Sequence, residues 1–221
     1  MKKGFWIFSL AVAMTACNNN ETGNDANGDT LGTHNGHQNG TTNTTAVDTG
    51  NMAGQSMMEL MQANMSQMKE MKSTGNPDKD YAAMMKVHHM GALKMAQVQA
   101  AKGTDAQLKQ LAQQMITEQQ NEINTFEAFI SGNSSANNGD VFYKAAMKGM
   151  NDMKMEMDHS GSIDKQFAQM MIPHHQGAID MSNMYLKNGA QDAKLKELAN
   201  KIISDQQKEI KELQTWLSTN Q

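Results

Sequence analysis

The chain has 221 residues, a formal net charge of −4 at pH 7 and a single cysteine. A mildly acidic chain without a basic stripe is a poor candidate for nucleic-acid binding. One cysteine excludes an intrachain disulfide and a cluster of thiolate metal ligands.

Residues 1–17 have the pattern of a bacterial lipoprotein signal peptide. Lys2 and Lys3 precede a short apolar run over 5–13, and the tetrapeptide MTAC follows, ending at Cys17. The apolar run is too short to span a membrane, which takes about 20 residues. The pattern predicts export from the cytoplasm and lipidation of Cys17, which would anchor the protein to a membrane in the periplasm or at the cell surface. The alternative is an ordinary secretory signal with an incidental cysteine.

Residues 18–54 consist mostly of Asn, Gly, Thr and Asp. A segment so poor in apolar side chains cannot bury enough surface to offset the entropy lost on ordering. We therefore interpret it as a flexible tether between the anchor and the folded part. His34 and His37 lie inside it and are interpreted as linker residues rather than as metal ligands.

From residue 56 onward the chain is predicted to be all-α. Ala, Gln, Lys, Glu and Met dominate, and proline occurs only at Pro77 and Pro173. The pattern predicts helices over roughly 56–73, 79–102, 105–130, 140–158, 163–188 and 192–218.

The helical part contains two copies of one unit. Residues 81–103 align without gaps on 167–189, with nine identities in 23 positions, and 108–130 align equally well on 195–217. An αα-hairpin cannot bury its apolar stripe alone, so the two hairpins are predicted to pair into a four-helix bundle, with additional methionine-rich helices beside it. The predicted boundaries are 55–131 for the first repeat, 132–139 for the linker and 140–221 for the second repeat.

Methionine is the most unusual feature of the composition, with 23 residues. Methionine can fill a core, and Met58, Met61, Met65 and Met68 recur at the spacing of a buried helical stripe. Leucine fills most core positions at a smaller entropy cost, so many methionines are expected to be present for their sulfur. A thioether is a soft, neutral ligand that suits Cu(I) and Ag(I), and imidazole extends the range to Cu(II).

Two Met-Met-x-x-His-His motifs carry the main candidate ligands, within MMKVHHMGALKM at 84–95 and MMIPHHQGAIDM at 170–181. On a helix, the first histidine shares a face with the methionine four residues before it and the methionine seven residues after it. The second histidine points about a quarter turn away. The paired histidines are therefore expected either to serve different ligand sets or to flank a groove. The candidate ligands are Met84, Met85, His88, His89, Met95, Met170, Met171, His174, His175 and Met181.

A third methionine-rich patch lies within MKGMNDMKMEMDHSG, residues 147–161. Some of its methionines fit one helix face, but the rest alternate with other residues, which suits a segment that wraps around an ion. Packing is the alternative interpretation. The candidate ligands in this patch are Met150, Met153, Met155, Met157 and His159.

The second unit resembles the DUF305 family in Phe167, in MMIPHHQGAIDM and in LKELANKIISDQQKEIKELQTWL from Leu195. The first unit resembles a more divergent copy, with Lys86 and Met90 in place of Ile172 and Gln176. The resemblance implies a ferritin-like helical fold. Methionine-rich members of the family include periplasmic copper-binding proteins linked to copper resistance, so the resemblance makes the four motif histidines and their neighbouring methionines the leading ligands.

The sequence thus predicts a membrane-anchored extracytoplasmic protein that buffers or sequesters Cu(I) and Cu(II) and contributes to copper tolerance. It is predicted to catalyse no reaction. Silver is a further candidate ion, and a copper exporter or chaperone is a candidate partner.

Two alternatives remain open at this stage. A methionine-rich interaction module would explain the methionines but not the paired histidines. A di-iron carboxylate protein needs Glu-x-x-His on two helices, and here only Glu156-x-x-His159 fits. The repeated acidic residues are interpreted as a solvated helix face or as salt-bridge partners of lysines; they are Glu118, Glu122, Asp205 and Glu209.

Overall fold

The computed structural model describes residues 55–132, 139–152 and 160–220. These residues form six α-helices and no strand, which confirms the all-α prediction. No helix among them is long and apolar enough to cross a membrane. The helices are α1 (Met57–Glu70), α2 (Pro77–Lys102), α3 (Ala106–Gly132), α4 (Val141–Asp152), α5 (Ile163–Lys187) and α6 (Ala193–Thr219).

The connection between α1 and α2 differs from the prediction. α1 ends at Glu70 because the next residues form a turn around Asp80, whose carboxylate accepts hydrogen bonds of 2.7 Å from Ser73 Oγ and from the backbone N–H of Thr74. α2 begins two residues earlier than predicted, since the Asn76 side chain accepts from the first backbone N–H groups of the helix.

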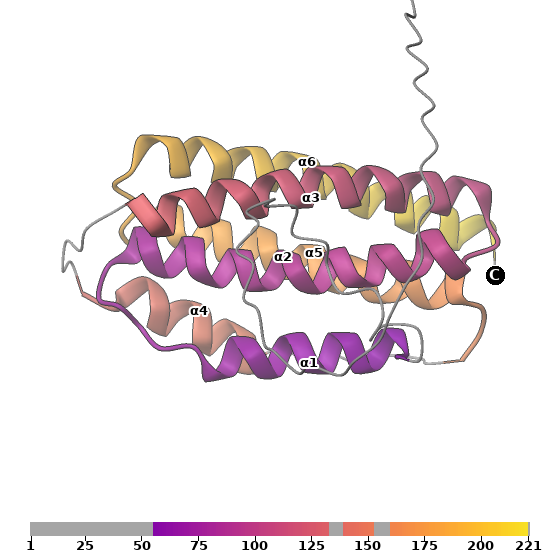
Figure 1. Cartoon of the computed structure of the whole chain (residues 1–221), viewed down its shortest axis with the longest axis horizontal. Helices are drawn as coiled ribbons and strands as arrows, with labels where there is room; N and C mark the ends of the chain where they lie inside the picture. Colours follow the sequence, from indigo (N-terminus) through magenta and orange to yellow (C-terminus); the bar gives the residue numbers. More distant parts are fainter. Residues whose placement is uncertain (1–54, 133–138, 153–159, 221) are drawn as a thin grey trace, which may run out of the picture. The chain divides into compact units, whose positions relative to one another are not determined.

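The predicted four-helix bundle is present. The α2–α3 and α5–α6 hairpins pack against each other through α2 and α5, which run antiparallel (Figure 1). α1 and α4 contact α2 and α5 on the face opposite α3 and α6, so three layers of helices follow one another (Figure 1). The methionine-rich helices thereby cover the two histidine-bearing helices.

Matching hydrogen bonds relate the two repeats. Asp78, at the start of α2, accepts from the Tyr185 hydroxyl and from two backbone N–H groups in the turn before α6. Asp164, at the start of α5, accepts from Gln99 Nε2 at 2.6 Å and from two backbone N–H groups in the turn before α3. Each repeat thus holds the turn of the other repeat's hairpin.

Much of the core is built from methionine and aromatic side chains. Tyr81 and Tyr185 stack with ring centroids 4.0 Å apart, and Phe126 and Phe142 meet Tyr81 edge-on. Every methionine in the described part of the chain is buried or half-buried. Core packing therefore accounts for part of the methionine excess, as one of the two sequence interpretations expected.

Candidate metal centre

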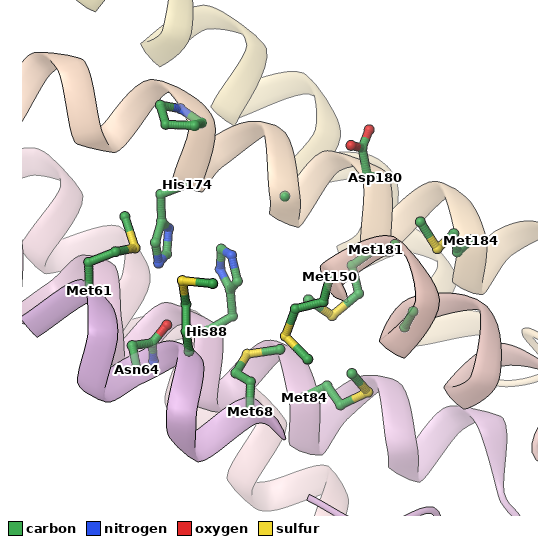
Figure 2. A pocket seen from close by; sticks show the side chains of 15 residues that line it. Met61, Asn64, Met68, Met84, His88, Met150, His174, Asp180, Met181 and Met184 are labelled. Carbon is green, nitrogen blue, oxygen red and sulfur yellow. The ribbon is translucent and has the colours of Figure 1, made fainter. Parts of the chain in front are cut away.

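A cavity of about 90 Å³ lies between α2 and α5 and the two helices that cover them. Figure 2 shows two histidines and several methionine sulfurs around it. The methionines that line it are Met61, Met65, Met68, Met84, Met150, Met181 and Met184. The remaining lining residues are His88, His174, Asn64, Ala146, Gly149, Pro173, Gly177 and Asp180.

His88 and His174 face each other at this cavity, one from each repeat (Figure 2). Their ring centroids are 3.8 Å apart and their planes are tilted by 43°. His88 is 9% exposed and His174 4% exposed. Neither ring nitrogen of His174 has a hydrogen-bond partner among the described residues, and the same holds for Nδ1 of His88. Buried polar atoms are normally paired, so these nitrogens are suited to binding a ligand.

Burial lowers the pKa of both His88 and His174 well below its usual value, and the neighbouring imidazoles lower it further. Both rings are therefore neutral at neutral pH. A neutral imidazole carries the free lone pair that a metal ion requires.

His89 and His175 point away from the cavity, toward α3 and α6. His89 Nε2 donates a hydrogen bond of 2.8 Å to Glu122 Oε2. His175 Nε2 lies 2.8 Å from Glu209 Oε2, at an angle that departs from hydrogen-bond geometry. Both rings are fully buried. The first histidine of each motif thus faces the cavity and the second faces a carboxylate.

The interpretation of the acidic residues as a solvated face is wrong for Glu122, which is buried at 8% exposure. Burial raises the pKa of Glu122, but the hydrogen bonds from His89 and Lys201 outweigh this effect and leave the pKa below its usual value. The salt bridge with Lys201 agrees with the predicted lysine partners, and Asp205 likewise pairs with Lys201. The carboxylate of Glu122 points into the bundle because the polar side of α3 packs against His89, the second histidine of the first motif.

The other predicted ligands divide between the cavity and the core. Met84, Met150 and Met181 line the cavity. The remaining motif methionines are buried and do not line it; they are Met85, Met95, Met170 and Met171. Met153, Met155, Met157 and His159, like Cys17, lie outside the described residues.

Sequence reasoning did not propose four of the lining methionines as ligands. Met61, Met65 and Met68 belong to the α1 stripe, which was recognised but interpreted as core, and Met184 lies near the end of α5. The helical spacing was the available signal. It could not separate the two roles, because one face of α1 both packs on the bundle and lines the cavity.

Carboxylates and other hard metal ligands do not cluster around this cavity. In residues 55–132, 139–152 and 160–220, no three His, Cys, Asp or Glu side chains are placed to hold a metal ion together. Asp180 lines the cavity, but its carboxylate points away from the histidine pair and accepts a 2.9 Å hydrogen bond from Gln176 (Figure 2). The donor atoms around the two histidines are thus mainly thioether sulfurs, which suit soft ions.

The sequence profile of the family described as "Domain of unknown function (DUF305)" matches residues 11–130 and again residues 132–221. The chain belongs to the DUF305 family. The two successive matches agree with two tandem copies of the DUF305 unit. An uncharacterized protein of Acanthamoeba polyphaga mimivirus is 46% identical over 54 residues, which are 24% of this DUF305 chain and 35% of the viral protein. The chain thus spans about a third of the length of that relative.

Solved structures similar to this DUF305 chain include three forms of CopM. The Ag-bound form is 26% identical, with a TM-score of 0.50, over 65% of this chain and 96% of CopM. The Cu(II)-bound form is also 26% identical and the apo form 27% identical, each with a TM-score of 0.50 over 65% of this chain. They cover 98% and 97% of CopM, respectively. CopM, to which this chain is similar, has therefore been solved with silver bound and with Cu(II) bound.

Proposed function

We propose that this protein binds copper outside the cytoplasm through methionine and histidine side chains and so buffers or sequesters it, contributing to copper tolerance. The observation that carries the proposal is the buried His88–His174 pair, whose unpaired ring nitrogens face a cavity lined by methionine. Thioether and neutral imidazole together form a ligand set for Cu(I), with Cu(II) and Ag(I) as further ions.

Two further observations support the proposal. The similarity to CopM, which has been solved with silver and with Cu(II) bound, extends over nearly the whole of CopM. The single cysteine lies at the predicted lipidation site, so the folded part offers no thiol that oxidation could link. Methionine and histidine remain usable metal ligands in an oxidising compartment.

The protein, in this proposal, holds metal and converts no substrate. The predicted signal and tether would place the bundle near a membrane surface, where a copper exporter or chaperone is a candidate partner for the bound ion. Binding and release by neutral ligands need no chemical step of the protein.

The burial of methionine argues against the alternative of an interaction module. Such a module would present its methionines on the surface. In the described residues none of the methionines is exposed, and Val141 is the only large hydrophobic side chain that is.

The proposal is tested by titrating the metal-free full-length chain with Cu(I) in competition with a chromophoric Cu(I) chelator. The wild-type chain is expected to take Cu(I) from the chelator. Affinity should fall about tenfold or more in H88L/H174L and also in M150L/M181L, since each removes donors from the cavity.

The variant M85L/M171L is the matched control, because these buried methionines lie on the same helices without lining the cavity. Its Cu(I) affinity should equal that of the wild type. A wild-type chain that takes no Cu(I) from the chelator would contradict the proposed function.

A further inference from the structure

We infer that His88 and His174 bind one metal ion between them, so that the two repeats share a single histidine-dependent site instead of holding one ion each. This shared site rests on the proposed copper-binding function. Beyond that function, it identifies the side chains that bind the ion and the number of ions that they bind.

The distance between the two rings favours one shared ion. Their centroids are 3.8 Å apart. Because both rings face the same cavity and an imidazole nitrogen binds a metal ion at about 2 Å, two ions bound side by side, one on each ring, would be only about 4 Å apart. Two ions held at that separation would repel each other strongly in a partly buried site. Neutral imidazoles and thioethers supply no charge to offset this repulsion.

The unpaired nitrogens also favour a shared ion. His174 brings two buried nitrogens without a hydrogen-bond partner, and His88 brings at least one. Buried polar atoms without a partner lower the stability of a fold, and a bound ion removes this cost. One ion between the rings would engage a nitrogen of each at the same time.

Each repeat has only one imidazole to give to the cavity. The rings of His89 and His175 lie 6.3 Å and 6.4 Å from those of the histidines that precede them. Both turn toward a carboxylate of the third helix of their own repeat. The second histidine of each motif is thus turned away from the cavity and does not line it, so it does not complete a separate site around the first.

The surroundings of the two histidines differ between the repeats. Around Gly91 the space is filled, because a Cβ atom there would lie 2.4 Å from the Asn64 side chain of α1. At the matching position of the second repeat, Gly177 lines the cavity together with Gly149 and Met150. Asn64 therefore fills the space beside Gly91 in the first repeat, whereas Gly177 of the second repeat borders the cavity, so the two repeats do not offer equivalent ion sites.

Two quantities test this shared site: the number of ions bound and the number of imidazoles that bind each ion. The metal-free full-length chain is titrated with Cu(I) under chelator competition, beside H88L, H174L and the double variant. The wild type is expected to bind one Cu(I) in the class of sites whose affinity depends on these two histidines. Each single variant should weaken that class about tenfold or more, and the double variant should lose less than the sum of the two single losses, because both act on the same ion.

A second measurement uses the wild-type chain alone. X-ray absorption spectroscopy of this chain, loaded with one equivalent of Cu(I), should show two imidazole nitrogens bound to the copper. Two ions in the histidine-dependent class, one of which survives at wild-type affinity in each single variant, would overturn the shared site. One imidazole per copper would overturn it as well. Either result leaves the proposed copper binding intact, whereas a wild-type chain without affinity for Cu(I) removes the proposed function itself.

Discussion

The two histidines of each motif differ in environment because adjacent residues on a helix point about 100° apart. His88 and His174 meet at a cavity with unpaired nitrogens. His89 contacts the buried carboxylate of Glu122 on α3, and His175 contacts the half-buried carboxylate of Glu209 on α6. The same dipeptide thus supplies one candidate ligand and one side chain that connects the helices of a hairpin.

This difference predicts opposite effects on the stability of the metal-free protein. In H89L/H175L the buried carboxylate of Glu122 loses the hydrogen bond from His89, which should lower the free energy of unfolding by about 1–3 kcal/mol, and Glu209 loses its contact with His175. In H88L/H174L a leucine of similar volume replaces a ring whose nitrogens lack partners, so stability should stay equal or rise. Urea unfolding of the metal-free full-length chains measures both. Equal losses in the two double variants would show that the cavity-facing histidines are also structural.

At the scale of the helices, the close contact of α1 with α2 positions the methionine stripe over the histidines. Asn64 Nδ2 donates a 2.6 Å hydrogen bond to the backbone carbonyl of Val87, one residue before His88. The contact is possible because residue 91 is glycine. A buried polar residue of α1 thus connects this helix to the turn of α2 that bears His88.

The substitution G91A should therefore displace α1. Its new Cβ atom would meet Asn64 Cγ at 2.4 Å, so Asn64 must move and its bond to Val87 is strained or lost. The expected cost is about 1–3 kcal/mol in the free energy of unfolding, together with weaker Cu(I) binding. G132A is the matched control, because nothing lies within 4 Å of a Cβ atom there. A G91A chain as stable as G132A would show that α1 adapts without cost.

At the scale of the whole molecule, the two repeats form one bundle in which each repeat holds the turn of the other through Asp78 and Asp164. The cavity takes side chains from both repeats, so neither repeat could form it alone. A chain with two copies of the motif is needed for a complete set of lining residues.

The predicted lipid anchor also belongs to this scale. When the chain is expressed in a bacterium, C17A should move it from the membrane fraction to the soluble extracytoplasmic fraction, because Cys17 is the predicted site of lipidation. Fractionation and immunoblotting measure the change, and K3R serves as a control that keeps the charged start. A C17A chain that still sediments with membranes would contradict the anchor.

The helical fold and the two repeats could be predicted from the sequence alone, and soft-ligand chemistry remains the proposal that the sequence suggested. Composition and spacing record local geometry, and the duplicated MMxxHH pattern is visible without any contact between distant residues. The α1 methionine stripe was equally visible, but its spacing is the same for packing and for lining a cavity.

Only the tertiary structure decided which histidine of each pair faces the cavity and which methionines join it. Periodicity places His88 and His89 on different sides of α2 but does not say which neighbouring helix each side meets. The neighbours of each histidine depend on the packing of the helices. α3 and α6 bring Glu122 and Glu209 to one side of α2 and α5, and α1 and α4 cover the opposite side. These are contacts between residues far apart in the chain, and the packing of whole helices determines them.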